Sequence, residues 1–299
     1  MEISKKNAVA FGLAGIIMAG CAAKATGQNQ PPMRVHTATE AQEITPVPAT
    51  ETVAGNQVTF ETSGAVRTVS GNGLPDHMVG AFPNGGNPNT ISAQNVSLQM
   101  PLSPASAPQT TSAQGWVFGV STNGVVFDPF AGEFWQGNPR SGWNYDALGG
   151  AVPLGVDANY AHVQPNGTYH YHGIPFGLLE MIRYDSGSHS PLVGYAADGY
   201  PIYALTGILD GELTQVESSY RLKAGDRPGG DEPDGDYDGA FVQDYEYVEG
   251  LGDLDQCNGA FTVSAEYPNG TYAYFLTEDF PVVPRCFTGT PDASFQHRR

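Results

Sequence analysis

The sequence predicts a mainly β protein, a single β-rich, sandwich-like domain with many hairpins, long loops and one or two short helices. Two observations predict this class. The 299 residues include 38 glycines and 23 prolines, which is typical of a chain with many turns. Aromatic residues make up 11% of the chain, and short segments that alternate apolar and polar residues recur along it. A short helix is expected at residues 176–183, close after Pro175.

The charge of the chain is strongly acidic. Lys and Arg number 13 against 31 Asp and Glu, which gives a formal net charge of −18. Such a surface repels phosphate backbones, so we expect no nucleic-acid partner. Its attraction for cations is only a general indication of metal binding.

The first residues are typical of a bacterial lipoprotein signal peptide. A pair of lysines precedes an apolar run that is too short for a comfortable membrane span, and Met-Ala-Gly-Cys follows at residues 18–21. We expect residues 1–20 to be removed and Cys21 to carry acyl chains such as palmitate. The protein would then be anchored by lipid to the membrane of the bacterial cell envelope. Ala22 is not a retention signal of the aspartate type, which favours the outer over the inner membrane.

The mature chain is expected to have two parts. Residues 21–55, which begin with the lipidated cysteine, are rich in Gln, Pro, Thr, Ala and Glu. They cannot bury enough apolar surface to offset the entropy of ordering, so a disordered linker is expected. Strand-like alternation starts at residue 57, and residues 56–299 are expected to form the β-rich domain.

Residues 165–173, Pro-Asn-Gly-Thr-Tyr-His-Tyr-His-Gly, combine a turn, a strand and a possible metal chelate. Asn-Gly is a strong hairpin signal, and a strand should follow it. Successive side chains of a strand point to opposite faces, so Tyr169 and Tyr171 share one face while His170 and His172 share the other. The two histidines are then roughly 6.6 Å apart at the backbone. Their imidazoles can therefore converge on one ion.

A second copy of this pattern lies about a hundred residues later. Residues 268–275 repeat Pro-Asn-Gly-Thr and the two tyrosines, but Ala273 and Phe275 stand in place of the histidines. We infer that the tyrosine face is a packing solution common to both copies and that the histidine face is an addition. The alternative is that the histidines are solvated or are hydrogen-bonded fillers.

Three further histidines are candidate ligands. An Asn-Gly hairpin would bring His162 back beside His170, and three ligands with an open position are the pattern of a catalytic metal site. His77 lies in a Gly-, Asn- and Pro-rich segment typical of a loop, and His189 is the other candidate. Imidazole-only ligation suits one copper(II) or zinc ion, and no soft cluster for copper(I) is present.

Several acids are candidates for a general base. They are Asp128, Glu133 and Asp198, although most such acids are turn or cap partners. A Ser-His-Asp hydrolase built from Ser188 or Ser190 is disfavoured because no Gly-x-Ser-x-Gly elbow is present. Residues 234–239 match the first half of a calcium loop, but its twelfth position is Tyr245 rather than Glu. We interpret this segment as a solvated acidic turn.

Cys257 and Cys286 remain after the leader cysteine is set aside. An even pair in an exported, oxidising compartment predicts a disulfide. The alternative is two buried free thiols.

The chain resembles the bacterial YHYH-domain family, which is named for the motif at residues 169–172. The resemblance extends over most of residues 70–292 and includes five other segments, at residues 74–77, 123–129, 164–168, 190–203 and 253–259, and then Phe280-Pro281 and Arg285-Cys286-Phe287. It implies an exported protein, commonly a lipoprotein, and carries no established activity with it. Some similar sequences have histidines in the second copy too. Ala273 and Phe275 depart from that pattern, which favours a single site.

The function expected from these observations is that of an exported, lipid-anchored protein that binds copper or zinc through its His-x-His strand. One alternative is a metal-dependent hydrolase or oxidase at the same site, so whether the protein is an enzyme is left open. Another is a metal-free cell-envelope module that binds glycan or protein through exposed aromatic residues.

Overall fold

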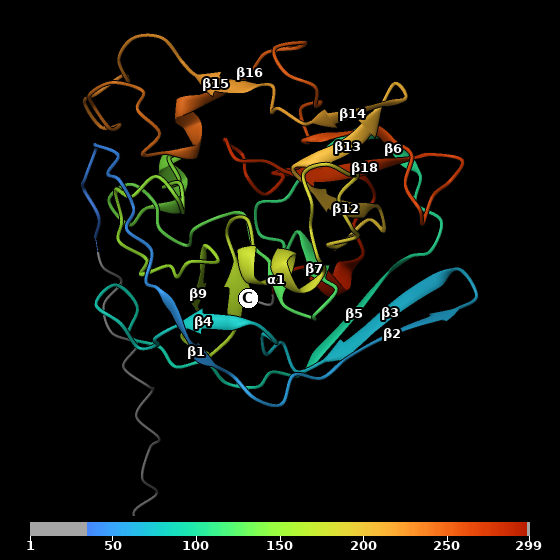
Figure 1. The fold of residues 1–299 in the computed structure, drawn as a ribbon. Helices are drawn as coiled ribbons and strands as arrows, with labels where there is room; N and C mark the ends of the chain where they lie inside the picture. The colour runs from blue at the N-terminus through green and yellow to red at the C-terminus, as the bar shows by residue number, and fades with distance from the viewer. Residues whose placement is uncertain (1–34, 298–299) are drawn as a thin grey trace, which may run out of the picture. The chain divides into compact units, whose positions relative to one another are not determined.

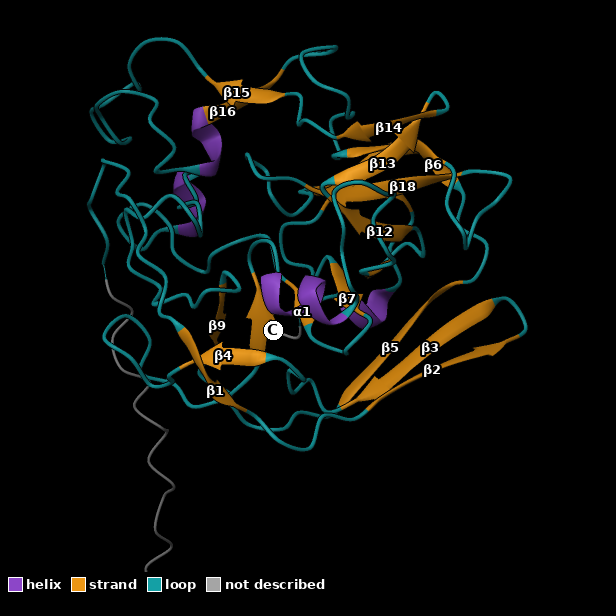
Figure 2. Cartoon of the chain, in the orientation of Figure 1, coloured by secondary structure: helices purple, strands orange, loops and turns teal. Residues whose placement is uncertain are grey.

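The computed structural model describes residues 35–297, and its strands confirm the mainly β class (Figures 1 and 2). The leader and Cys21 lie outside the described residues. None of the helices within residues 35–297 has the length and apolar character needed to cross a membrane.

The strands are short and many. Their bounds are β1 (Ala49–Thr52), β2 (Val58–Ser63), β3 (Val66–Gly71), β4 (Met78–Gly80), β5 (Val96–Pro101), β6 (Ser106–Ser112), β7 (Gly119–Ser121), β8 (Val126–Phe127), β9 (Ala161–Val163), β10 (Tyr169–Tyr171), β11 (Gly194–Ala196), β12 (Pro201–Ala204), β13 (Thr206–Leu209), β14 (Glu212–Gln215), β15 (Tyr220–Leu222), β16 (Tyr245–Tyr247), β17 (Gly259–Thr262), β18 (Thr271–Leu276) and β19 (Cys286–Gly289).

Helical structure in the described residues is limited to one α-helix and three 3-10 turns. The turns are η1 (Pro139–Ser141), η2 (Val242–Asp244) and η3 (Ala293–Phe295). The helix, α1 (Phe176–Met181), begins where the sequence predicts, directly after Pro175. It ends earlier than expected because Arg183 has a φ of 60°, in the left-handed region that a helix cannot continue.

Eight strands form one mixed sheet in the order β17-β18-β12-β11-β7-β8-β10-β9. It is built from four antiparallel hairpins, β7–β8, β9–β10, β11–β12 and β17–β18. β10 pairs with β8 in parallel, and β18 pairs with β12 in the same way. β7 and β11 meet as an antiparallel pair at the centre. The sheet therefore consists of two similar halves related by an approximate two-fold axis, a first half (β7, β8, β10, β9) and a second half (β11, β12, β18, β17).

The loops that lead into the outer hairpins are also alike. Tyr160 and Asn258, one in each half, have φ of 48° and 57°. The carbonyl of Tyr160 accepts a hydrogen bond from the backbone N–H of His172 at 2.8 Å, and the carbonyl of Asn258 accepts one from Phe275 at 2.9 Å. The end of β10 and the corresponding part of β18 are therefore fixed by equivalent contacts.

Smaller sheets surround this central one. β2, β3 and β5 form a three-stranded antiparallel sheet that extends away from the eight-stranded one in Figure 1. Four two-stranded pairs complete the set, β1–β4, β13–β14, β15–β16 and β6–β19. The main hydrophobic core includes Tyr169, Tyr171 and Tyr274, so the tyrosine faces of both sequence copies pack inward as predicted.

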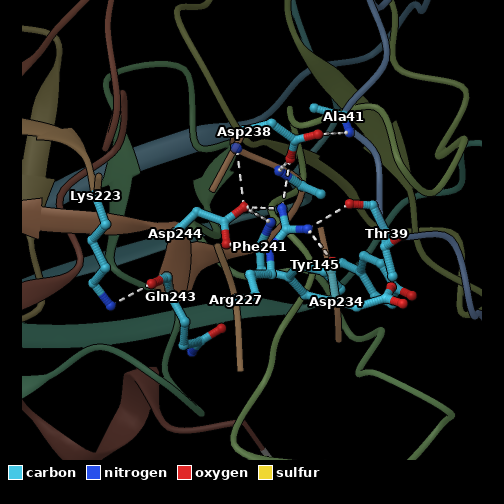
Figure 3. Close-up of polar contacts among 12 residues, drawn as sticks. Thr39, Ala41, Tyr145, Lys223, Arg227, Asp234, Asp238, Phe241, Gln243 and Asp244 are labelled. Carbon is cyan, nitrogen blue, oxygen red and sulfur yellow. Dashed lines mark hydrogen bonds and ion pairs between the residues drawn. The ribbon is translucent and has the colours of Figure 1, made fainter. Parts of the chain in front are cut away.

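Residues 35–52 correct the prediction of a disordered linker. The guanidinium of the buried Arg227 donates to the carbonyl of Thr39 at 2.6 Å, and the backbone N–H of Ala41 donates to the carboxylate of Asp238 at 2.8 Å (Figure 3). Further along, β1 pairs with β4. This polar segment is held because its backbone groups find partners in the domain, which composition alone does not reveal.

The acidic turn at residues 234–239 is organised by the same arginine. Arg227 donates to the carbonyl of Asp234 at 2.9 Å and pairs with Asp238 at 2.6 Å (Figure 3). A guanidinium therefore supplies the positive charge on the inner side of this turn.

Cys257 and Cys286 form the predicted disulfide, with their Cα atoms 5.0 Å apart. The bond joins the loop before β17 to the first residue of β19. It therefore attaches the β6–β19 pair to the second half of the sheet.

Candidate metal centre

The hairpin of β9 and β10 is closed by the turn that the Asn-Gly pair predicts. The side-chain oxygen of Asn166 accepts a hydrogen bond from the backbone N–H of Thr168 at 3.1 Å. Gly167 has a φ of 89°, and a Cβ at this position would lie 2.0 Å from Oγ of Ser92. Only glycine fits both the conformation and the space, so the turn is fixed by sequence.

Three imidazole rings meet at the end of this hairpin. His170 lies opposite His162 in the register, and His172 follows on the same face. Nε2 of His172 is 3.0 Å from Nε2 of His170 and 3.1 Å from Nε2 of His162. One nitrogen of each ring lies within 4.8 Å of the others, close enough to share one ion. The structure thus brings these three histidines together where the sequence predicts.

Hydrogen bonds at Nδ1 determine which ring nitrogen of His162 and of His170 carries the hydrogen. Nδ1 of His162 is 3.0 Å from the carbonyl of Leu154, and Nδ1 of His170 is 3.3 Å from that of Thr168. A carbonyl oxygen only accepts, so each Nδ1 carries the hydrogen and each Nε2 presents a lone pair. Metal-binding histidines are commonly oriented in this way.

His172 stands between these two lone pairs and cannot satisfy both. Its Nδ1 is buried and makes no hydrogen bond of normal geometry among the described residues, although the backbone carbonyl of Asp128 lies near the ring. If Nε2 carries the hydrogen, it can point at only one neighbour at a time. If Nδ1 carries it, three lone pairs face one another. A cation between the rings would accept all three lone pairs.

The second half of the sheet has the same framework without the imidazoles. Ala260 and Ala273 face each other there, and Phe275 follows. These residues occupy the places of the three histidines and belong to a separate apolar cluster. The framework therefore folds with apolar residues at these positions, and the hairpin itself does not require histidine.

One family model matches a continuous stretch of the chain that includes both halves of the sheet. A family model described as YHYH protein matches residues 97–289, nearly two thirds of the chain. The chain belongs to the YHYH protein family. The YHYH match runs from β5 to the end of β19 and includes both halves of the sheet and all three histidines. No curated protein and no solved structure matches the chain.

Burial keeps the imidazoles of the YHYH motif and of His162 neutral. Burial and the charge of His170 lower the pKa of His162 to about 3. Burial also lowers the pKa of His170, and burial with the two neighbouring rings lowers that of His172 well below its usual value. At neutral pH these rings therefore have no proton to lose before they bind a metal.

Asp128 lies beside the YHYH histidines. Its backbone N–H donates to the carbonyl of Tyr171 at 2.9 Å, which holds it next to β10. Its carboxylate is buried, and its negative charge acts on both His162 and His170. The amide nitrogen of Gln164 is 3.5 Å from the same carboxylate. Of the three candidate acids, Asp128 is the one that the fold places at the cluster.

A fourth histidine, which the sequence does not single out, reaches the same carboxylate. Nε2 of His297 is 3.3 Å from Oδ2 of Asp128. The backbone N–H of His297 donates to the carbonyl of Gly115 at 3.1 Å, which fixes the end of the described chain here. The hydrogen bond with Asp128 raises the pKa of His297. No motif marks this residue, and it lies beyond the YHYH match.

His77 is not part of the cluster, contrary to its place among the candidate ligands. It lies on the tyrosine face of β10, with Nε2 2.6 Å from the hydroxyl of Tyr171 and Nδ1 2.8 Å from the carbonyl of Met78. The hydroxyl donates to Nε2, because Nδ1 must carry the hydrogen that Met78 accepts. Both ring nitrogens are thus used in holding the loop to the strand.

His189 belongs to the second half of the sheet instead. Its Nε2 is 3.0 Å from Oγ1 of Thr262, and its Nδ1 is 2.7 Å from the carbonyl of Ser190. The hydroxyl of Ser190 donates to the carbonyl of Pro191 and not to this ring. The described residues therefore contain no Ser-His-Asp arrangement at this position.

The other two candidate acids are engaged elsewhere. Asp198 is buried and accepts hydrogen bonds from the hydroxyl of Tyr274 at 2.6 Å and from the backbone of Gly289 at 2.8 Å. Burial raises the pKa of Asp198. Glu133 lies in the loop after β8, where its carbonyl accepts from Asn144 at 2.7 Å. Neither acid contacts the three histidines.

Proposed function

We propose that this YHYH protein binds one transition-metal ion, zinc or copper(II), through His162, His170 and His172. We propose further that it does so as an exported, lipid-anchored protein of the bacterial cell envelope. The observation that carries the metal site is the convergence of three Nε2 atoms that no arrangement of protons can satisfy together.

The spacing of the nitrogens supports a small ion. Zinc–nitrogen bonds are about 2.0–2.1 Å long, so two imidazole nitrogens of a tetrahedral site lie about 3.3 Å apart. The two separations from His172, 3.0 and 3.1 Å, would have to open by about 0.3 Å, and the third pair, His162 with His170, lies within 4.8 Å. Two of the three rings are already turned so that Nε2 is the free nitrogen.

The donor set supports zinc or copper(II). Imidazole suits both ions, whereas copper(I) favours thiolate and thioether sulfur. Cys257 and Cys286 supply no thiolate because they are joined in a disulfide.

A metal-dependent hydrolase or oxidase at the same site is a second candidate. Three protein ligands leave a coordination position open for water or substrate. The observation that favours this candidate is the buried carboxylate of Asp128, whose charge acts on two of the rings and which could accept a proton from bound water.

The envelope location rests on the leader pattern that ends at Cys21. It is tested by expressing the full chain with labelled palmitate and separating membrane from soluble fractions. The wild-type protein should carry the label and sediment with membranes. Cys21→Ser should lose both properties, and label retained in this variant would contradict the anchor.

The metal site is tested by elemental mass spectrometry of the full chain, purified after expression with its own leader. The informative variant is His170→Ala with His172→Ala. The matched control is His36→Ala with His189→Ala, which also removes two imidazoles but leaves the cluster intact. The fold of each variant is checked by circular dichroism.

The expected result is about one equivalent of zinc or copper in the wild type and in the control, and none in the cluster variant. If folded wild-type protein contains no metal and takes up none on titration, the proposal is wrong. A metal-free module that binds glycan or protein would then be the function to test.

A further inference from the structure

The three histidines are enclosed, so an ion needs a route to them. His170 and His172 have relative exposures of only 1% and 2%. His162 is half-buried and lies on β9, the strand at the edge of the sheet. An ion therefore has to pass the groups around that edge.

Two charged groups act on the cluster. Asp128 places a negative charge that acts on His162 and His170. The positive charge of Arg285, which is paired with Asp146 at 2.7 Å, acts on His172. Asp128 therefore attracts a cation toward the cluster, whereas the charge of Arg285 is largely offset by Asp146.

Asp128 connects the cluster to solvent through His297. The side chain of Asp128 is 6% exposed and that of His297 is 38% exposed, and their facing atoms are 3.3 Å apart. The charge of His297 also acts on His170, so the three groups follow one another from the surface to the cluster. Imidazole and carboxylate are both donors that zinc and copper(II) accept.

We propose that His297 and Asp128 form an outer metal-binding pair, from which a divalent transition-metal ion passes to His162, His170 and His172. This inference rests on the proposed metal site. Two protein donors bind an ion weakly, so the outer pair transfers the ion and does not store it. The ion exchanges one protein donor for another as it moves inward and at no stage loses all of them.

Asp128 has a second part in this scheme. A dication among neutral imidazoles is a buried charge, and burying a charge without a counter-charge is unfavourable. Asp128 is the acid whose charge acts on two of the three rings, so it stabilises the ion after transfer as well as during it. His297 is needed only while the ion is transferred to the three histidines.

The test measures rates and affinity separately with cobalt(II), whose visible absorption reports its ligands. The full chain is mixed with cobalt(II) in a stopped-flow instrument, and release is followed after addition of excess chelator. The variants are His297→Ala and Asp128→Asn. The control is His36→Ala, which removes a histidine that lies against Tyr145.

In His297→Ala, association and dissociation should both slow by about tenfold or more, because the barrier to passage rises when the ion loses its outer donor. The dissociation constant should stay within about threefold of the wild-type value, because a group used only on the route lowers the barrier in both directions. In Asp128→Asn, association should slow and affinity should also fall. His36→Ala should match the wild type.

Three results would overturn the inference. Faster dissociation with weaker affinity in His297→Ala would make His297 a ligand of the final site. Faster association and faster dissociation in this variant would show that the His297 side chain obstructs the route to the cluster. Unchanged rates would remove it from the route altogether. Failure of the metal site itself is distinguishable, since the wild type would then show no saturable cobalt(II) spectrum.

Discussion

His170 lies directly opposite His162 in the register of β9 and β10. The second half of the sheet repeats this register with Ala273 opposite Ala260. One β framework therefore occurs twice in the chain, and only one copy carries imidazoles. The fold and the candidate chemistry are separable, so the site can be removed or altered while the other half keeps the same architecture.

Metal binding should stabilise the folded protein. A ligand that binds only the native state at 100 times its dissociation constant adds about 2.7 kcal/mol to the free energy of unfolding. Zinc should therefore raise the thermal unfolding midpoint, and a chelator should reverse the shift. His170→Ala should abolish the zinc-dependent shift, and His189→Ala should keep it. An equal shift in both variants would place the zinc elsewhere.

The position of the three histidines could be predicted because local rules determine it. The two-residue period of a strand places His170 and His172 on one face, and the Asn166-Gly167 turn returns the chain so that His162 lies alongside. The repeated motif at residues 268–275 likewise indicated which face packs, as the buried Tyr274 shows.

Contacts between distant segments could not be predicted in this way. His297 reaches Asp128 because Gln296 forms a β-bridge with Trp116, shortly before β7, and no local pattern encodes that bridge. The prediction that His77 is a metal ligand was wrong for the converse reason. A histidine in a glycine-rich loop is expected at a site, but here the loop packs on the tyrosine face of β10.

The stability of the metal-free protein should depend on pH through the histidine cluster. An unfolded histidine has a pKa of 6.5, whereas that of His162 is lowered to about 3. Between these values the unfolded chain binds a proton that the folded chain does not, so stability falls as pH decreases from 6.5 toward 3. His170 and His172, whose pKa values are also lowered, act in the same direction.

The measurement is a series of urea unfolding curves of metal-free protein between about pH 7 and pH 5, where few carboxylates titrate. His162→Gln should reduce the slope of the unfolding free energy against pH. The comparison is made as a difference between wild type and variant, so other titrating groups cancel. An identical slope in the two proteins would show that His162 is not held neutral in the folded state.

Tyr171→Phe should destabilise the protein by about 1–3 kcal/mol, the cost of leaving a buried polar group without its partner. The variant removes the hydroxyl that donates to Nε2 of His77 at 2.6 Å. Asn123 also loses this partner but keeps Asp76 at 2.8 Å. Urea unfolding at neutral pH provides the measurement. Tyr184→Phe, at a half-buried tyrosine outside this network, should stay within about 0.5 kcal/mol of the wild type.

Arg227→Met should destabilise the protein by about 3–5 kcal/mol, as expected when a buried ion pair loses one partner. Arg227 is held by Asp244 at 2.6 Å, and both side chains are fully buried (Figure 3). The variant leaves that carboxylate without its counter-charge and also removes the bond to the carbonyl of Thr39. Limited proteolysis should therefore cut residues 35–47 sooner in the variant than in the wild type.

The matched control for this prediction is Arg221→Ala. Arg221 pairs with Glu246 at 2.9 Å, but their side chains are 58% and 40% exposed. Exposed ion pairs contribute about 0–1 kcal/mol, so this variant should unfold nearly as the wild type does and should not open the N-terminal segment. If the two arginine variants behave alike, Arg227 is not what holds residues 35–47. Backbone pairing such as that of β1 with β4 would then have to account for the order of this segment.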